Sequence, residues 1–387
     1  MSILSKTKIA PPVVVVIGGG ATGTGIAKQA AEQGFKVVLI ERGTIGSGTT
    51  GHFHGILHSG ARYAVNDPLV AAECYRENQM LRSVIPSAIT DTGGMFVAYN
   101  EQEVAHADVL IQACSVAGIP VTEISVEQAL QAEPMLNKSL LRAFTVPDGT
   151  IDGDELVNIN AKAARQAEVP ATFIEHHSVA GFKRKADEIT AVTIKHVRTG
   201  ETEDIACDYV INASGVWAGS ITKFADIELD MIFDKGTMIV FKQQLSKAVI
   251  NRCRPEDDGD LLAPHNGHSI MGTTSRVITS PDDCIPTQEE ADVLLREGTV
   301  MAPSMSSAEA LRIYAGVRPL LRSKADEQEN GTNRSVSRAF RVLDHAEQGV
   351  ENFISITGGK VTLYRCMAEA TIDLLCEKRG RSKTLSG

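Results

Sequence analysis

Residues Val13–Arg42 read VVVVIGGGATGTGIAKQAAEQGFKVVLIER, and this stretch predicts the unit around which the rest of the chain is organised. Its β-branched opening, residues 13–17, is too short for a helix face and indicates a buried strand. A glycine-rich turn follows, then a helix predicted over 24–33 and a second buried strand over 36–40. This order of elements predicts the βαβ unit of a dinucleotide-binding fold.

The turn between the first strand and the helix matches the pattern G-x-G-x-x-G. Gly18 permits a tight turn, Gly20 lets the backbone approach a pyrophosphate, and Gly23 lets the helix pack closely on the strand. The N–H groups of the first helical turn then point at the anion. Glu41 follows the second strand, where its carboxylate can accept the hydroxyls of an adenosine ribose. A glycine-rich turn in another kind of βαβ unit is the alternative.

Composition and charge narrow the class of protein. A chain of 387 residues can bury two cores, so we expect two lobes. The net charge of −10 argues against nucleic acid as a partner and against electrostatic adhesion to anionic lipid. The seven cysteines form no C-x-x-C pair, which favours reduced thiols in a cytoplasmic protein. We expect no signal peptide and no bilayer-spanning run, so any peripheral contact with the inner face of the cell membrane would use a partner or a surface patch.

The order of predicted strands and helices divides the chain into two discontinuous lobes. Dinucleotide-type patterns return twice after the first unit, which predicts a first lobe made of residues 12–90, 148–222 and 335–387. Residues 91–147 and 223–334 are expected to form the second lobe, in a mixed and largely antiparallel arrangement. The predicted fold class is therefore α/β, a Rossmann-like lobe with an inserted α+β lobe.

Local periodicity predicts one long helix in the first lobe. It covers residues 68–85, with Val70, Cys74, Met80 and Leu81 on the inner face.

In the second lobe we expect strands at 233–241 and 269–272 and helices at 288–297 and 307–312. The polar stretch 323–333 is expected to be a surface loop.

Five separated motifs are similar to those of one enzyme family. They are Leu57–Tyr63 (LHSGARY), Val249–Arg254 (VINRCR), Met271–Ser275 (MGTTS), Tyr314–Leu320 (YAGVRPL) and Ile356–Lys360 (ITGGK). With these motifs in this order, the chain resembles the FAD-dependent glycerol-3-phosphate dehydrogenases, which are flavin oxidoreductases of the D-amino-acid oxidase type. Within that family it is most similar to the catalytic A subunits of anaerobic bacterial enzymes. The resemblance implies FAD as the cofactor, whereas the glycine pattern alone leaves NAD and FAD open.

The sequence departs from this family in two places. Membrane-bound aerobic members carry a histidine, a favoured proton acceptor, where this chain reads KGTM at residues 235–238. The second departure concerns cysteines. The resemblance to the catalytic A subunits extends to proteins that have a further C-terminal domain, whose clustered cysteines would suit an iron–sulfur centre. This sequence reaches Gly387 with Cys366 and Cys376 as its last cysteines. We therefore expect electrons to leave the flavin directly or through another polypeptide.

Motif and resemblance together imply a set of FAD-binding residues. The loop 43–51 is dense in glycine and hydroxyl groups that can wrap phosphate and ribose, with a flexible surface loop as the alternative. The expected FAD-binding residues are Gly18, Gly20, Ala21, Thr22, Gly23, Glu41, Arg42, Thr49, Thr50, Gly51, Gly55, Leu57, Val179, Ala213, Ser214, Gly215, Trp217, Gly358, Gly359, Lys360 and Val361.

The resemblance also implies a substrate site for a phosphorylated alcohol. Its expected residues are Arg62, Tyr63, Arg318, Arg338 and Lys360. A planar guanidinium donates paired hydrogen bonds to a phosphate, and lysine adds a point charge. Arg318 could instead form a structural ion pair and Arg338 a surface one. Lys360, at the start of a predicted helix, could be an exposed side chain.

Alcohol oxidation also needs a group that takes the hydroxyl proton. We favour His58, which matches the family's histidine in the flavin-facing loop, as base or flavin-edge donor, with Arg318 as the second catalytic residue. His265 is the next candidate for the base, and an ordinary hydrogen-bonded histidine is the alternative at each position. His52, His54 and His58 could together bind a metal. No nearby carboxylate or cysteine completes a ligand set, so we expect no metal site.

The implied activity is oxidation of sn-glycerol 3-phosphate to dihydroxyacetone phosphate, with a hydride moving from C2 to flavin N5. Quinone, or a membrane-located iron–sulfur partner subunit, would then accept the electrons. One alternative is an L-2-hydroxyglutarate oxidase or dehydrogenase, whose flavin loop has a similar pattern. The other is a non-catalytic flavoprotein subunit of a membrane complex. The sequence is compatible with a homo-oligomer and does not specify one.

Overall fold

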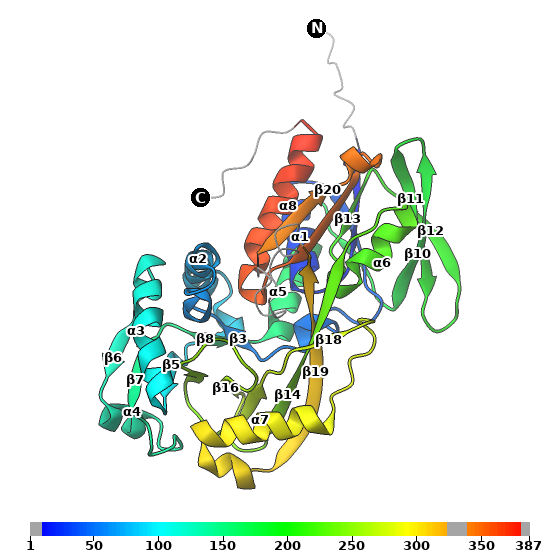
Figure 1. The fold of residues 1–387 in the computed structure, drawn as a ribbon. Coiled ribbons are helices and arrows are strands. Elements are labelled where there is room, and N and C mark those ends of the chain that lie inside the picture. Colours follow the sequence, from blue (N-terminus) through cyan, green and yellow to red (C-terminus); the bar gives the residue numbers. More distant parts are fainter. Residues whose placement is uncertain (1–9, 323–338, 381–387) are drawn as a thin grey trace.

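The computed structural model describes residues 10–322 and 339–380, and Figure 1 shows how they are arranged. A six-stranded sheet forms the centre of the first lobe, in the order β20-β21-β13-β1-β2-β9, and only β20 and β21 pair antiparallel. Strands from the two ends of the chain therefore lie in one sheet. The bounds are β1 Val13–Ile17, β2 Lys36–Ile40, β9 Thr172–Ile174, β13 Tyr209–Asn212, β20 Phe340–Asp344 and β21 Phe353–Gly358.

Both faces of this sheet are covered, which explains why its strands are apolar throughout. Val14 and Val16 of β1 pack with helices α1, α5 and α8 on one face. Val15 and Ile17 pack against the antiparallel sheet β10-β11-β12 on the other face. Figure 1 shows the three helices on one side of β13 and the small sheet on the other. The bounds are α1 Ala21–Glu32, α5 Gly153–Arg165, α8 Tyr364–Lys378, β10 His177–Lys185, β11 Glu188–His196 and β12 Thr202–Ala206.

A nine-stranded sheet forms the second lobe, in the order β18-β14-β17-β16-β15-β5-β7-β6, with β19 paired to β14. Its pairs are antiparallel except β5 with β15, so the expected mixed, largely antiparallel arrangement is confirmed. Helices α4 and α7 pack on this sheet, and α3 contacts both the sheet and α2. The bounds are β5 Gly94–Ala98, β6 Thr122–Ile124, β7 Arg142–Val146, β14 Met231–Phe241, β15 Val249–Arg252, β16 Leu261–His265, β17 His268–Gly272, β18 Arg276–Ile278, β19 Ala310–Leu321, α3 Glu101–Val116, α4 Val126–Ala132 and α7 Gln288–Met301.

The helix predicted over 307–312 is wrong. A 3-10 turn ends at Ser307, and the chain then enters β19, which pairs with β14 along almost its whole length. This ladder overrides the local helical pattern, because strand propensity depends strongly on the neighbouring strand. Leu311 and Ile313 are left exposed on β19, so this end of the strand depends on its pairing with β14 and not on burial of its apolar side chains.

A small three-stranded sheet, β3-β8-β4, lies near the junction of the lobes beside helix α2. Helix α2 buries Val70, Cys74 and Leu81 as predicted, but Met80 is 41% exposed, so that part of the prediction is wrong. Met80 directly precedes Leu81 and turns away from the buried stripe. The bounds are α2 Pro68–Val84, β3 Ile56–Leu57, β4 Ile89–Thr90 and β8 Gly149–Ile151.

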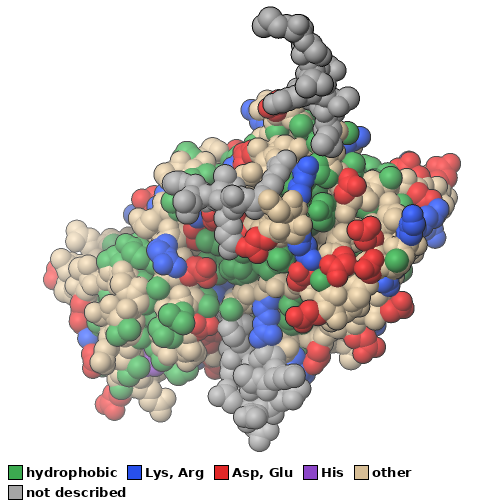
Figure 2. Space-filling view, turned by 90° about the horizontal axis from the view of Figure 1, so that it is seen from above, with side chains coloured by type: hydrophobic (Ala, Val, Ile, Leu, Met, Phe, Trp, Pro, Cys, Tyr) green, Lys and Arg blue, Asp and Glu red, His purple; other side chains and the backbone are tan. Residues whose placement is uncertain are grey.

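The second sheet draws its strands from residues 94–146 and 231–321. The exact lobe boundaries stay a prediction, and the predicted loop 323–333 lies outside the described residues. On the face seen in Figure 2, acidic and basic side chains are interspersed rather than gathered into one basic patch. In the described part of the chain, no helix combines the length and apolar character needed to cross a membrane.

Candidate functional site

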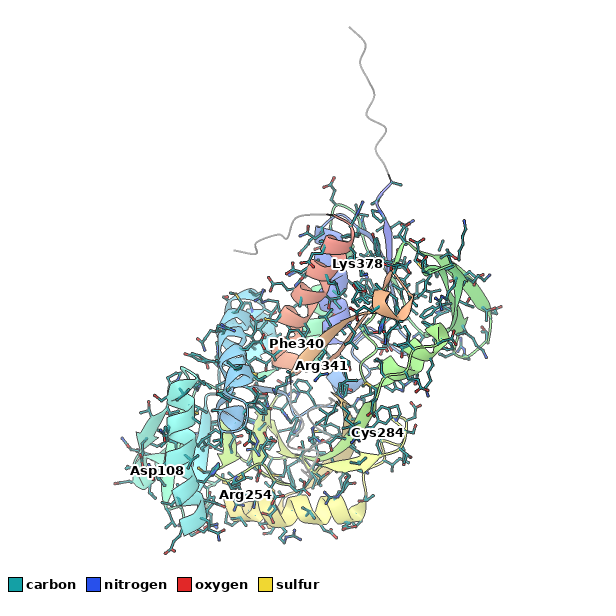
Figure 3. All side chains as sticks on the ribbon, turned by 45° about the horizontal axis from the view of Figure 1, so that its top comes forward. Asp108, Arg254, Cys284, Phe340, Arg341 and Lys378 are labelled. Atoms are coloured by element: carbon teal, nitrogen blue, oxygen red, sulfur yellow. The ribbon has the colours of Figure 1, made fainter. Side chains whose placement is uncertain are left out.

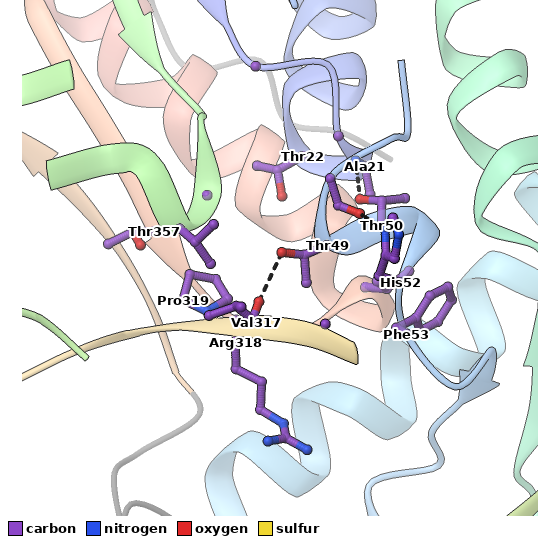
Figure 4. Close-up of a pocket in the computed structure, with 18 of the residues that line it drawn as sticks. Ala21, Thr22, Thr49, Thr50, His52, Phe53, Val317, Arg318, Pro319 and Thr357 are labelled. Atoms are coloured by element: carbon purple, nitrogen blue, oxygen red, sulfur yellow. Dashed lines mark hydrogen bonds between the residues drawn. The ribbon is translucent and has the colours of Figure 1, made fainter. Parts of the chain in front are cut away.

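A cavity of about 880 Å³ lies between the two lobes. The first lobe contributes the turns that follow β1, β2, β13 and β21. The second lobe contributes Gly236 and Met238 of β14 and residues 316–320 of β19. Figure 4 shows Thr49 and β19 on facing walls, joined by a 2.9 Å hydrogen bond from Thr49 Oγ1 to the Val317 carbonyl oxygen.

Backbone groups form the end of the cavity next to helix α1. Gly18 has a φ of +106°, and a Cβ there would lie 2.5 Å from the Ala213 carbonyl oxygen. A Cβ on Gly23 would lie 1.9 Å from the Gly18 carbonyl oxygen, so this glycine is required for packing. Within the part of the chain that the structure describes, a Cβ on Gly20 would meet only Thr50 Oγ1, at 3.1 Å, and would otherwise point into the open cavity. The turn therefore leaves space at the position where a pyrophosphate would approach the helix.

The N-cap residue of helix α1 is Gly20, which has no side chain of its own to cap the helix. The N–H group of Ala21 is bound by Thr50 Oγ1 at 3.0 Å. At the same end, the Glu41 carboxylate accepts hydrogen bonds of 2.7 Å from the N–H groups of Gly19 and Gly43. These bonds hold the carboxylate at the cavity wall. An anion-ready helix terminus beside a fixed acid fits the pyrophosphate and ribose of FAD.

Second-lobe residues also reach this end. Asp282, in the segment after β18, lies 3.4 Å from the Arg42 guanidinium and accepts a 3.0 Å hydrogen bond from Trp217 Nε1. The Arg42 guanidinium stacks on the Trp217 ring at 4.2 Å. This cluster joins the two lobes at the mouth of the cavity, with all three residues lining it.

Most of the expected FAD-binding residues line the cavity. They are Gly18, Gly20, Ala21, Thr22, Glu41, Arg42, Thr49, Thr50, Val179, Ala213, Ser214, Gly215, Trp217, Gly358, Gly359, Lys360 and Val361. Gly23, Gly51, Gly55 and Leu57 lie outside the lining. Gly51 packs against the backbone of Gly46, and Leu57 is fully buried in strand β3. We therefore expect these four residues to support the cavity wall from behind. Contact with FAD stays a proposal for every residue of the expected set.

A row of rings forms one wall at the other end of the cavity. The rings of His54 and His58 meet edge to face with centroids 5.2 Å apart, and those of His58 and Tyr63 do so at 5.3 Å. The Lys360 ammonium lies 3.9 Å from the centre of the Tyr63 ring. Tyr63 belongs to a 3-10 turn, Ala61–Tyr63, after Gly60, whose φ of +93° and close approach to Ala71 require glycine.

The surroundings of both histidines in this wall favour the neutral imidazole. Burial lowers the pKa of His58 well below its ordinary value, and His54, Lys360 and Arg62 lower it further. Burial, followed by the charges of Arg318 and Arg62, lowers the pKa of His54 to about 3. A neutral imidazole can accept a proton, which a base must do.

Arg62 is held by a buried carboxylate of the second lobe. Its Nη2 lies 2.5 Å from Asp260 Oδ2, and Arg254 Nε lies 2.6 Å from Asp260 Oδ1. Asp260 is 1% exposed, while Arg62 Nη1 is buried with no hydrogen-bond partner among the described residues. Figure 3 shows Arg254 beside helix α7, where it also pairs with Glu297 at 3.2 Å. Asp260 therefore fixes one edge of the Arg62 guanidinium and leaves the other edge available at the cavity.

Arg318 is held in the same manner. Its Nη1 lies 2.8 Å from Asp234, which is fully buried, and its Nη2 donates to Thr273 Oγ1 at 2.5 Å and to the Thr274 carbonyl at 3.2 Å. Ser275 Oγ donates to Asp234 at 2.6 Å. Figure 4 shows the Arg318 side chain extending from β19 on the side opposite Thr49. Arg318 thus forms the structural ion pair weighed as an alternative and also lines the cavity, so the two interpretations do not exclude each other.

The cavity brings together His58, Arg62, Tyr63, Arg318 and Lys360, all expected at the substrate end. Arg338 lies outside the described residues. His265 is not part of the lining; its ring packs beside Gly55. Within the described residues, no group of three His, Cys, Asp or Glu side chains is arranged to hold a metal ion. Sequence reasoning missed the two buried aspartates, Asp234 and Asp260, because nothing near either in the sequence connects it to its arginine.

The chain is similar to known proteins over nearly its whole length. Residues 14–372 match the family described as DAO, FAD dependent oxidoreductase. The sequence is 42% identical to the A subunit of anaerobic glycerol-3-phosphate dehydrogenase from Escherichia coli K12, over 96% of this chain and 68% of that protein. It is 38% identical to the A1 subunit of anaerobic glycerol-3-phosphate dehydrogenase from Haloferax volcanii, over 95% of this chain and 64% of that protein. L-α-glycerophosphate oxidase of Mycoplasma pneumoniae, solved with FAD bound, has the same fold, with a TM-score of 0.77 at 18% identity over 95% of each chain.

Proposed function

Because the chain belongs to the FAD dependent oxidoreductase family, and within it to the anaerobic glycerol-3-phosphate dehydrogenase A subunits, we propose that it oxidises sn-glycerol 3-phosphate to dihydroxyacetone phosphate. FAD is the cofactor of the family. When bound, it supplies the acceptor for the hydride that leaves C2 of the substrate. The protein's own residues bind the substrate, orient it and take the hydroxyl proton.

One observation supports a phosphorylated substrate above all others. Arg62 and Arg318 come from different lobes, face the same cavity and are each fixed by a buried aspartate. Lys360 approaches the same region from the segment after β21. Cations held in this way can grip a dianion through several charge-assisted hydrogen bonds with little loss of side-chain entropy. That remote grip supplies the binding energy that positions C2 for reaction.

His58 is the proposed base. It is buried, lines the cavity and carries no proton near neutral pH, so it can accept the proton of the C2 hydroxyl. A dianionic substrate beside it would raise its pKa and so strengthen it as a base once the complex has formed. Lys235, in the KGTM stretch, does not act as the base in this proposal, because its ammonium forms an ion pair with Glu290 at 2.9 Å.

Electrons are proposed to leave toward quinone or toward a membrane-located partner subunit. This proposal is supported by the names of the relatives, which describe one lettered subunit of a larger enzyme. The L-2-hydroxyglutarate alternative would need recognition of a second carboxylate, whereas the cations fixed here favour a phosphate dianion.

Anaerobic titration of the purified flavoprotein tests the function directly. Glycerol 3-phosphate should bleach the flavin absorbance, whereas glycerol, which lacks the anionic handle, should do so very poorly. Faster bleaching by L-2-hydroxyglutarate would replace the proposal with the alternative enzyme. Absence of bleaching by every phosphorylated polyol and 2-hydroxyacid would favour a non-catalytic flavoprotein subunit.

A further inference from the structure

His54 carries a contact that specifies which of its ring nitrogens bears a proton. The backbone N–H of Ile56 donates a 3.2 Å hydrogen bond to His54 Nδ1. A nitrogen that accepts this bond has no proton of its own, so the neutral ring must carry its proton on Nε2. The intervening Gly55 has a φ of +72°, a conformation that glycine adopts readily and that places residues 54 and 56 for this contact.

The position of His54 indicates what this Nε2–H group meets. His54 lines the cavity, and the charges of both Arg62 and Arg318 act on its ring. On its other side the His58 ring lies edge to face, at an interplanar angle of 85°. The ring therefore lies within the electrostatic influence of both arginines proposed to hold the anionic group and in contact with the ring of the proposed base.

We propose that His54 is a neutral hydrogen-bond donor to the anionic end of the substrate, acting through Nε2–H. This inference rests on the proposed function and deepens it. A neutral donor adds a hydrogen bond to a dianion without adding a further positive charge between two arginines. The same tautomer prevents His54 from acting as the base, because Nε2 already bears a proton and Nδ1 is occupied by the Ile56 N–H group. The hydroxyl proton is left to His58.

Two amide substitutions separate the donor role from a space-filling role. In His54→Gln the side-chain amide can place an N–H group near the position of Nε2. In His54→Asn the shorter amide reaches only the position of Nδ1. The neighbouring His52→Asn is a matched control, because His52 Nδ1 donates to the Gly48 carbonyl at 2.9 Å and the ring has the opposite tautomer.

The first measurement is the affinity of the flavin-loaded protein for inorganic phosphate, followed through the flavin absorbance. His54→Asn should weaken phosphate binding by about tenfold or more, because one hydrogen bond to a charged group is lost. His54→Gln should recover most of that affinity, and the His52→Asn control should change it by less than about threefold. In steady-state assays, kcat should fall far less in His54→Asn than in His58→Ala, while KM for glycerol 3-phosphate rises.

The second measurement is the nitrogen-15 NMR spectrum of the histidine rings, which reports the tautomer independently of activity. It should show Nδ1 unprotonated and Nε2 protonated at His54. A protonated Nδ1, or equal phosphate affinities for the Asn and Gln variants, would overturn the donor role. Loss of kcat in His54→Asn comparable to that in His58→Ala would make His54 the base instead. If the parent protein binds phosphate and is reduced by glycerol 3-phosphate, such results count against His54 alone; if the parent does neither, the proposed function falls with it.

Discussion

At the end of the cavity beside helix α1, glycines and backbone N–H groups form much of the surface, whereas at the other end charged and aromatic side chains form it. The first end depends on the absence of side chains, since a Cβ on Gly18 or Gly23 would collide with neighbouring backbone. The second end depends on charged side chains held by buried partners, as Asp234 and Asp260 hold Arg318 and Arg62. Substitutions at the first end should therefore abolish binding of the cofactor. Substitutions at the second end should lower activity by amounts that depend on the residue.

The largest expected effect is loss of FAD in Gly20→Val. Two methyl groups would fill the space beside the helix N-terminus, yet among the described residues a Cβ there would meet only Thr50 Oγ1, so the fold should survive. Flavin content after gel filtration and the thermal unfolding midpoint measure the two effects. Gly181→Ala, at an open position on β10, is the control and should retain its flavin. Full flavin content in Gly20→Val would show that the turn does not bind the pyrophosphate.

His58→Ala should lower kcat by about 100- to 10,000-fold, the usual range for loss of a general base. Because His58 belongs to the side-chain end of the cavity, its removal should leave the flavin bound. Stopped-flow reduction of the flavin by glycerol 3-phosphate measures the chemical step without the acceptor. A decrease below about threefold would assign proton removal to another group.

Arg318→Lys should lower kcat/KM by about tenfold or more, because lysine keeps the charge but loses the planar fork. Asp234→Asn should also lower kcat/KM, because the Arg318 guanidinium would no longer be held in position. If Asp234 acts only in this way, the double variant should be no worse than Arg318→Lys alone. Arg322→Lys is the matched control just beyond the same strand, since Arg322 forms an exposed ion pair with Asp230 at 3.1 Å. If the losses in kcat/KM were additive in the double variant, Asp234 would not act by holding Arg318 in position.

The smallest effect concerns stability at acid pH. The unfolded chain protonates His54 below about pH 6.5, whereas burial keeps the folded pKa at about 3. The folded state therefore binds fewer protons in this window, and its stability is full above pH 6.5 and falls as the pH decreases. Urea unfolding at pH 7.0 and 5.5 should show a loss about 1 kcal/mol smaller in His54→Gln than in the parent. Equal losses would mean that His54 is protonated in the folded protein.

The same contrast explains how much of the molecule could be predicted. The glycine turn and its βαβ unit could be predicted because their parts lie within residues 13–42, where spacing and glycine chemistry are local. The family resemblance located the arginines but not their partners. Arg318 lies 84 residues from Asp234 and Arg62 lies 198 residues from Asp260, distances over which sequence pattern carries no contact information.

Strand β19 failed for a related reason. Its start was predicted as a helix, because the partner strand β14 that stabilises it as a strand lies far back in the chain. The tautomer of His54 was equally hidden. It follows from a backbone contact two residues away that depends on the conformation of Gly55 rather than on residue type.

The place of β21 inside the central sheet bears on how the protein is made. This strand pairs with β13 and ends at Gly358, which completes the cavity wall together with Gly359 and Lys360. A ribosome synthesises the glycine turn long before this wall, so a nascent chain holds the dinucleotide fingerprint before it has the strand that completes the site. Until β21 inserts, the apolar β13 presents an unpaired edge, the kind of surface that invites aggregation and chaperone binding. Flavin incorporation is therefore expected to be a post-translational event, and truncations that remove β21 should yield a colourless and poorly soluble product.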